Sequence, residues 1–300
     1  MSEGPKLLLV DANNMAHRVF WTHKSLKHGA RGTGLLFGFM KGLVSLHKDY
    51  PDHFRIIAWD GGYARRLAES TAAVESGLIP SAYKATRDRE MTPELEEFME
   101  QREQLRTEIL PLIRCLQVVV DGVEADDVIY SYGRMAEKWN GNAVIVSSDL
   151  DFFQALDDHT IIRDPMKKET WTRERFELEF GFSPELWVDV GAIEGEVGPS
   201  KDNIHGVPGW GKVNARKYVR EHGNLDNVIA SLQAKTKRSK KEQTFLDNLE
   251  VLRLAFSLKK MDEVVVPKPR LIHDTDAEEI KKCFFGLGFA SLAKDVWRFV

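Results

Sequence analysis

The sequence predicts an α/β fold in which a mostly parallel central sheet is flanked by helices. Over residues 1–165, short apolar runs of strand length alternate with longer segments whose apolar residues recur at helical spacing. Such alternation is typical of a parallel sheet wrapped by helices. In addition, acidic residues follow the apolar runs, and open α/β sheets place their sites outside the carboxyl ends of their strands.

Four runs are predicted to be strands and three segments to be helices. The strands are expected at Lys6–Val10, Arg55–Trp59, Gln117–Val120 and Ala143–Val146, and the helices at Gly34–Tyr50, Pro93–Arg114 and Ala125–Asn140. Because the strands are nearly continuous apolar runs, we expect them to be buried on both faces of the sheet.

The acidic residues after these strands form a set that needs a counter-charge. It comprises Asp11, Asp60, Glu124, Asp126, Asp127, Asp149 and Asp151, most of them in the motifs GVEADDVI and VSSDLDFF. Two carboxylates about 4 Å apart repel by roughly 4 kcal/mol at an effective dielectric of about 20. Hard divalent cations are the usual counter-charge. For any single Asp after a strand, the alternative is a helix N-cap.

Bulk composition excludes several classes of protein. The 300 residues carry a formal net charge of −4, so any affinity for nucleic acid must come from local basic patches. Two cysteines, Cys115 and Cys283, and histidines without metal-ligand spacing support neither a disulfide framework nor a zinc site. The first apolar run is too short for a signal peptide and no segment approaches a membrane span. We expect a soluble cytoplasmic protein without a membrane partner.

Two further stretches have a basic character. The polar interval 61–92 carries Arg65, Arg66, Lys84, Arg87 and Arg89 close behind the strand that ends at Asp60. A long insertion beside an acidic site is usually functional or disordered. The run Lys235–Lys241 is either a solvated loop or a patch that contacts duplex DNA.

From Thr172 onward the pattern changes to helices and turns. In Asn203–Tyr218, three glycines precede a helix rich in Lys and Arg; the relevant residues are Gly206, Gly209, Gly211, Lys212, Arg216 and Lys217. The spacing also fits the start of a nucleotide-binding P-loop, but Val213 stands where that loop needs Ser or Thr, and no strand precedes it. Tight turns between two helices can instead direct backbone amides at a phosphate. The expected domains are 1–171, 172–260 and a segment 261–300 that packs back on the first.

Together these motifs resemble those of the structure-specific 5′-nuclease family, the flap endonucleases and 5′→3′ exonucleases related to the 5′-nuclease domain of bacterial DNA polymerase I. The matching segments are LLLVDANN, IIAWDGG, YKATRDRE, GVEADDVI, SSDLDFFQAL and KDNIHGVPGWGKVNA. The length of the chain resembles the stand-alone bacteriophage enzymes. The resemblance implies a PIN-like nuclease core, a helical arch over 61–92, and a helix–turns–helix that grips duplex DNA.

The resemblance also implies the chemistry of the site. Two Mg²⁺ or Mn²⁺ ions would be held by Asp11, Asp60, Glu124, Asp126, Asp127, Asp149, Asp151, Asp202 and Glu196. Lys84 and Arg87 would face the scissile phosphate, and Tyr83 would either stack on a base or pack the arch against the body. DNA would be bound by Arg65, Arg66, Tyr83, Arg89, Gly206, Gly209, Gly211, Lys212, Arg216 and Lys217, with K⁺ at the helix–turns–helix. Expected substrates of this monomer are 5′ flaps, 5′ overhangs, duplex junctions and RNA–DNA hybrids.

One position departs from the family pattern. The family carries an Asp three residues before the Asp of DNI, and here that position is Pro199. Either Val197–Pro199 is an insertion that lets Glu196 replace the missing ligand, or the ligand is lost and the second metal site is weakened. The acidic, glycine-rich surroundings favour the insertion. The alternatives for function are a PIN-type ribonuclease, or a branched-DNA binding protein that no longer cleaves.

Overall fold

The computed structural model describes residues 4–86, 90–270 and 274–300. Its central sheet has six strands in the order β5-β4-β1-β6-β7-β8, of which all neighbours are parallel except β7 and β8. The strands are β1 (Lys6–Asp11), β4 (Phe54–Trp59), β5 (Leu116–Val119), β6 (Asn142–Val146), β7 (Thr160–Asp164) and β8 (Glu169–Trp171), and a separate hairpin pairs β2 (Lys27–His28) with β3 (Arg31–Gly32). The predicted mostly parallel sheet flanked by helices is confirmed.

Twelve α-helices occur in the described residues. They are α1 (Ala12–Thr22), α2 (Gly34–Asp49), α3 (Ala64–Glu75), α4 (Pro93–Gln104), α5 (Ala125–Lys138), α6 (Arg173–Phe180), α7 (Trp187–Glu194), α8 (Lys212–His222), α9 (Leu225–Gln233), α10 (Lys240–Asp247), α11 (Leu249–Lys259) and α12 (Ala277–Gly286). Short π or 3₁₀ turns lie at Leu105–Ile109, Leu110–Leu112, Leu150–Ala155, Pro184–Leu186 and Leu292–Arg298.

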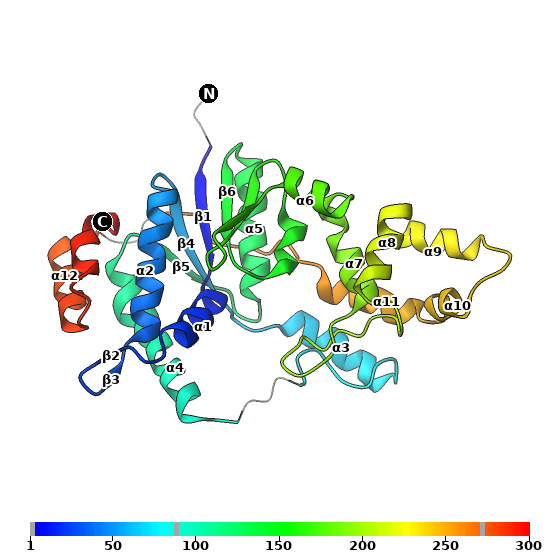
Figure 1. The fold of residues 1–300 in the computed structure, drawn as a ribbon, viewed down its shortest axis with the longest axis horizontal. Helices are drawn as coiled ribbons and strands as arrows, with labels where there is room; N and C mark the ends of the chain where they lie inside the picture. Colours follow the sequence, from blue (N-terminus) through cyan, green and yellow to red (C-terminus); the bar gives the residue numbers. More distant parts are fainter. Residues whose placement is uncertain (1–3, 87–89, 271–273) are drawn as a thin grey trace.

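The strand β1 shows why the apolar runs are continuous. Its side chains alternate between two hydrophobic cores: Leu7 and Leu9 belong to the core beneath α5, and Leu8 and Val10 to the core beneath α1 and α2. Successive side chains of a strand point to opposite faces, so a strand covered on both sides needs apolar residues at every position. In Figure 1 the helices lie on both sides of the sheet.

The four predicted strands and three predicted helices are present, with one marked difference in length. The helix expected over Pro93–Arg114 ends as α-helix at Gln104, and continues as a π turn and a 3₁₀ turn to Leu112. Pro111 lies in that last turn and has no N–H for a helical hydrogen bond, so a regular helix cannot continue through it. β7 and β8 extend the sheet beyond the strands that were predicted.

The C-terminal segment returns to the sheet. After α11, the chain runs extended beside α5, where Val264 N–H donates to Ser131 Oγ at 2.8 Å. The helix α12 and the turn Leu292–Arg298 then bury Phe284 and Phe299 in the core shared with α1 and α2. In Figure 1 these elements lie beside α2, while α7 to α11 extend away from the opposite end of the sheet. None of the helices in the described ranges combines the length and apolar character needed to cross a membrane.

The loop between α7 and α8 is shaped by close backbone approach. Glu196 and Ile204 pair as an isolated antiparallel bridge, with N–H···O distances of 2.6 and 3.1 Å, so residues 197–203 form a closed loop. Gly206 lies against the end of α7, where an added Cβ would lie within 3.0 Å of backbone atoms of residues 193–195. Gly211, at the N-cap of α8, has open space around it.

This difference predicts that two glycine substitutions cost unequal amounts of stability. Gly206→Ala should lower the free energy of unfolding by about 2 kcal/mol or more, because backbone must move to admit the methyl group. Gly211→Ala is the matched control, and should cost under about 1 kcal/mol as a poorer N-cap. Urea unfolding of both variants measures the difference. Equal stability of the two would contradict the close packing of Gly206 on α7.

Candidate active site

The carboxyl ends of the parallel strands open into one acidic cavity of ≈ 620 Å³. β1 lies at the switch point of the sheet, since the chain adds β4 and β5 on one side of it and β6 and β7 on the other. Ligand crevices in open α/β sheets occur at such points. Among the residues that line the cavity are Asp11, Asp60, Glu124, Asp126, Asp149, Asp202 and Lys84.

Some of these carboxylates also cap helices. Asp11 Oδ1 accepts from Asn14 N–H at 3.1 Å at the start of α1, and Asp11 Oδ2 accepts from Ser147 Oγ at 2.9 Å. Asp149 Oδ1 accepts from Asp151 N–H at 2.9 Å, and Asp60 Oδ1 from Ala125 N–H at 2.9 Å. The N-cap alternative therefore holds at Asp11 and Asp149, whereas Asp60 caps no helix that follows it and instead accepts from the first residue of α5. These hydrogen bonds fix the three carboxylates at the edge of the cavity.

Crowding and burial make several of these groups hard to ionise. Burial, with a smaller contribution from the charges of Asp60 and Asp149, raises the pKa of Asp11 to about 7. Burial followed by neighbouring carboxylates also raises the pKa of Asp126. The side chain of Asp149 opens to the cavity, but the surrounding protein desolvates it and Asp151 repels it, which raises its pKa to about 6. The cavity thus holds negative charge that is only partly compensated.

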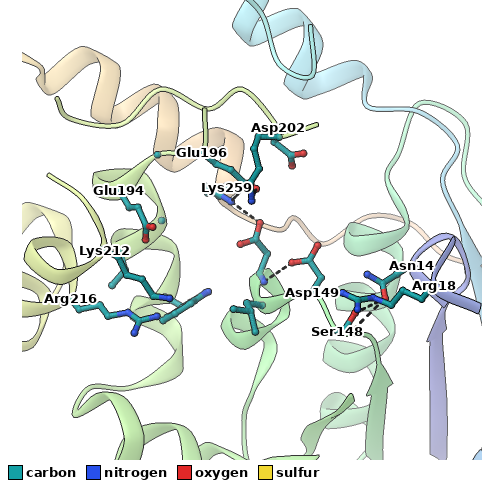
Figure 2. Close-up of a pocket in the computed structure, with 17 residues that line it drawn as sticks. Asn14, Arg18, Ser148, Asp149, Glu194, Glu196, Asp202, Lys212, Arg216 and Lys259 are labelled. Atoms are coloured by element: carbon teal, nitrogen blue, oxygen red, sulfur yellow. Dashed lines mark hydrogen bonds and ion pairs between the residues drawn. The ribbon is translucent and has the colours of Figure 1, made fainter. Parts of the chain in front are cut away.

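A second cavity of ≈ 440 Å³ adjoins the first, and shares Asn14, Arg18, Asp149 and Asp202 with it. Figure 2 shows how its charged side chains converge from α1, α7, α8, α11 and the loop after α7. Its acidic residues are Asp149, Asp151, Glu194, Glu196 and Asp202, and its basic residues are Arg18, Lys201, Lys212, Arg216 and Lys259. Glu196 thus lies with Asp151 and Asp202, although its carboxylate contacts Lys201 and Lys259 at 3.3 and 2.6 Å.

Lys84 is held at the mouth of the first cavity by a constrained backbone. Its φ of 56° lies in the left-handed region, which is uncommon for residues other than glycine, and its N–H donates to the carbonyl of Asp202 at 2.8 Å. The ammonium forms an ion pair with Glu124 and lies over the rings of Tyr63 and Tyr83. Strained residues persist where the surrounding structure determines their position, and they cluster at functional sites.

Arg66 has a structural role, and the prediction that it contacts DNA is corrected. Its buried guanidinium pairs with Glu124 at 2.7 Å and with both oxygens of Asp127 at 2.6 and 2.9 Å. It also donates to the carbonyls of Leu258 and Lys260, at the end of α11, at 2.9 and 3.0 Å. Because Arg66 occupies both oxygens of Asp127, we leave Asp127 out of the metal ligands that we propose.

Tyr83 packs against the body, which is the second of the two roles that the sequence left open for it. The side chain is 4% exposed, and its hydroxyl lies 3.0 Å from Asp202 Oδ2 and 3.2 Å from Glu124 Oε1. Its N–H donates to Ser70 Oγ in α3 at 3.0 Å. A ring enclosed in this way presents no face to a nucleobase.

The remaining candidate DNA contacts differ in accessibility. Lys212 and Lys217 are exposed on α8, whereas the Arg216 guanidinium lies over Phe180 and Trp187, with 4.6 and 5.1 Å to the ring centroids. Arg65 is half-exposed and pairs with Glu69 and Asp262 at 2.9 and 2.8 Å. Gly209 adopts a φ of 78° in open space. The predicted residues Arg87 and Arg89 lie outside the described residues.

The donor set fits divalent cations of the magnesium type. Carboxylate oxygens are the ligands these hard ions take, and Mg²⁺ retains several waters, so ligands spread around a cavity are suitable. Across the described residues, no three Asp, Glu, His or Cys side chains form a ready-made metal site. Three of the carboxylates take part in ion pairs instead: Glu124 contacts Lys84 and Arg66, and Asp151 and Glu196 contact Lys259. The raised pKa of Asp11 and of Asp149 marks where added positive charge would be favourable.

Among the residues of the two cavities that sequence reasoning missed are Asn14, Arg18 and Lys259. Asn14 and Arg18 follow Asp11 at intervals of three and seven residues, so helical periodicity would have placed them on the same face of α1. Lys259 has no local signal, because it is 108 residues from Asp151 in the sequence.

Comparison with known proteins matches the chain to two family models. Residues 6–181 match the model described as 5′-3′ exonuclease, N-terminal resolvase-like domain, and residues 182–282 match the model described as 5′-3′ exonuclease, C-terminal SAM fold. Among curated relatives, DNA polymerase I of Thermus thermophilus is 30% identical over 258 residues, and DNA polymerase I of Bacillus caldotenax is 30% identical over 298 residues. These alignments cover 85% and 95% of this chain but only 28% and 32% of those proteins.

Two solved structures show the same fold over nearly the whole chain. A flap endonuclease of bacteriophage T5, in a complex with DNA and metal ions, superposes with a TM-score of 0.67 at 21% identity, covering 97% of this chain and 98% of that one. The catalytic core of Rad2 in complex with a DNA substrate gives a TM-score of 0.59 at 14% identity, covering 98% and 91%.

The raised pKa of Asp11 predicts how pH changes the stability of the metal-free protein. Between the ordinary value of 3.8 and about 7, the folded state binds the proton more tightly than the unfolded chain, so stability falls as pH rises through this window. We expect Asp11→Asn to raise the free energy of unfolding by about 2 kcal/mol at about pH 8 in EDTA, and to have little effect at about pH 4. Urea unfolding measures this, with the exposed Asp158→Asn as control. An equal rise in the free energy of unfolding at both pH values would contradict the raised pKa of Asp11.

The burial of Arg66 predicts a large loss of stability on its removal. Arg66→Met leaves Glu124 and Asp127 without their main cation, and should cost about 3–5 kcal/mol at neutral pH. The neighbouring Arg65→Met removes half-exposed ion pairs and should cost about 1 kcal/mol or less. Urea unfolding of the two variants compares them directly. If both variants lose a similar, small amount of unfolding free energy, Arg66 is not the main cation that compensates Glu124 and Asp127.

Proposed function

This chain belongs to the 5′-3′ exonuclease family, and we propose that it is a divalent-metal-dependent 5′ nuclease. It hydrolyses DNA phosphodiesters near a 5′ end, as a 5′→3′ exonuclease and flap endonuclease in DNA replication or repair. The observation that carries the proposal is the acidic cavity at the carboxyl ends of four parallel strands, with Lys84 at its mouth. Parallel strands bring residues distant in sequence to one edge, as a multi-carboxylate metal site requires.

Two Mg²⁺ or Mn²⁺ ions fit the two adjoining cavities. The first would be held by Asp11, Asp60, Glu124, Asp126 and Asp149, and the second by Asp149, Asp151, Asp202 and Glu196. When bound, such ions lower the pKa of a coordinated water and stabilise the attacking and leaving oxygens of a phosphoryl transfer. The similar phage structure was crystallised with metal ions, which supports this choice of cofactor. K⁺ at the helix–turns–helix is part of the proposal.

Lys84 supplies positive charge to the reacting phosphate. Its ammonium faces the cavity and pairs with Glu124, so the approach of a phosphate lets it exchange one anionic partner for another. Since the backbone of Lys84 is fixed through Asp202, this exchange requires movement of the side chain alone. A cation placed in advance, where charge develops, stabilises the transition state. We assign Arg87 the same task, and Arg18 a contact with an adjacent phosphate.

We propose that surfaces outside the two cavities bind DNA. The turn at Gly209 and Gly211 and the exposed Lys212 and Lys217 contact the duplex backbone, which provides affinity without reading sequence. We propose that the interval 61–92, of which the structure describes 61–86 and 90–92, receives a single-stranded 5′ end as the predicted arch. We propose 5′ flaps, 5′ overhangs, duplex junctions and RNA–DNA hybrids as substrates of a monomer that acts in the cytoplasm of a bacterial or phage-infected cell. The DNA in the two similar structures supports this choice of partner.

Two other functions compete with this proposal. A PIN-type ribonuclease would share the acidic cavity, but it would have no need for the loops and helices between α7 and α11. A branched-DNA binding protein that no longer cleaves would fit Pro199 in place of a ligand. The second cavity nevertheless contains Glu196 next to Asp151 and Asp202, which favours retained cleavage.

A cleavage assay on a 5′-flap DNA with Mg²⁺ separates the three functions. We expect cleavage by the wild type, and a single-turnover rate at least roughly a hundredfold lower for Asp149→Asn, which removes a carboxylate between both cavities. Flap binding in EDTA should be retained or strengthened, because the variant lowers negative charge. The control Asp158→Asn should cleave normally. Cleavage of single-stranded RNA in preference to the flap would support the ribonuclease, and flap binding without cleavage would support the binding protein.

A further inference from the structure

Lys259 is a buried cation between two carboxylates of the second cavity. Its ammonium lies 2.8 Å from Asp151 Oδ2 and 2.6 Å from Glu196 Oε2, and its side chain is 7% exposed. Figure 2 shows it beside Glu196. Lysine is almost never this buried unless it is paired. The contact therefore represents a built arrangement rather than a surface ion pair.

The position of this ammonium is fixed by the elements around it. The carbonyl of Lys259 accepts from Gln154 at 3.1 Å, and the carbonyls on either side of it accept from Arg66. The stem of the side chain passes over Gly191 in α7, where an added Cβ would lie 3.5 Å from Cγ and Cδ of the lysine. Hydrogen bonds thus hold the backbone at Lys259, and the contact with Gly191 sets the direction of its side chain.

Glu196 gains its place in this arrangement from the closed loop after α7. The bridge between Glu196 and Ile204 holds its backbone, and its two carboxylate oxygens contact Lys201 and Lys259 separately. Of these two lysines, Lys259 lies closer to the Glu196 carboxylate, at 2.6 Å against 3.3 Å for Lys201. An ion that bound to Asp151 and Glu196 together would compete with the ammonium for both carboxylates.

We propose that Lys259 is a built-in cation of the second carboxylate cluster, and that it makes the second divalent ion bind more weakly than the first. The inference rests on the proposed function in taking over its two ion sites, the first at Asp11, Asp60, Glu124, Asp126 and Asp149 and the second at Asp149, Asp151, Asp202 and Glu196. The ammonium supplies one of the two charges that a divalent ion would bring. Like charges at contact distance disfavour the simultaneous presence of both. Lys259 thereby holds the second cluster together while that ion is absent.

Counting bound Mn²⁺ tests this without cleavage. Titration of the full chain, followed by the electron paramagnetic resonance of free Mn²⁺, should show one tight ion and a second bound at least roughly tenfold more weakly. Lys259→Met should strengthen the second ion by roughly tenfold or more and leave the first unchanged. The adjacent Lys260→Met removes an equal charge from an exposed side chain and should match the wild type.

Each outcome bears on the inference. Two equally tight ions in the wild type would overturn it without any variant, as would a Lys259→Met protein with wild-type binding. If Lys259→Met unfolds in EDTA, the wild-type titration still decides, and Mn²⁺ should restore the fold of the variant. Binding of no ion at all by the wild type would instead refute the proposed function. Loss of flap affinity in Lys259→Met, with unchanged Mn²⁺ binding, would show that Lys259 serves DNA rather than the cluster.

Discussion

Repulsion among carboxylates at one edge of the sheet governs much of this structure. Parallel strands end side by side, and the residues that follow them bring acidic groups into one cavity. Three cations from separate parts of the chain compensate some of this charge: Arg66 from α3, Lys84 from the segment after it, and Lys259 from α11. Each is largely buried, so its contribution is less screened than that of a surface pair. Burial, and after it the charges of neighbouring carboxylates, keeps the pKa of Asp11 and of Asp149 raised.

The same cations join the arch and the C-terminal helices to the core. Arg66 binds carboxylates of α5 and, through two carbonyls, the last turn of α11. Tyr83 and Lys84 contact both Glu124 and Asp202, which belong to different elements. The base of the arch is therefore attached to the residues that we propose for catalysis. An ion or a phosphate bound in the cavity would act on the contacts of Tyr83 and Lys84 with Glu124 and Asp202.

Much of this arrangement could be predicted from the sequence because its physical causes are local. A strand buried on both faces must be apolar throughout, so β1, β4 and β6 were found, and their last residues located Asp11, Asp60 and Asp149. The role of Arg66 could not be found in the same way, and the sequence could not decide between the two roles of Tyr83. An arginine and a tyrosine in a basic segment are residue types that often contact DNA. Only the packing of α3 against α11 and the body buries these two side chains. Lys259 depends wholly on tertiary contact.

The position of a bound metal tests the central claim most directly. Crystals grown with Mn²⁺ would reveal the ion through its anomalous scattering. We expect a strong peak in the first cavity, within one water layer of Asp11, Asp60 and Asp126, and a weaker one beside Asp149 and Asp202. Strong density elsewhere, with none in the first cavity, would contradict the view that the uncompensated charge at the carboxyl ends of the strands exists to hold a divalent cation.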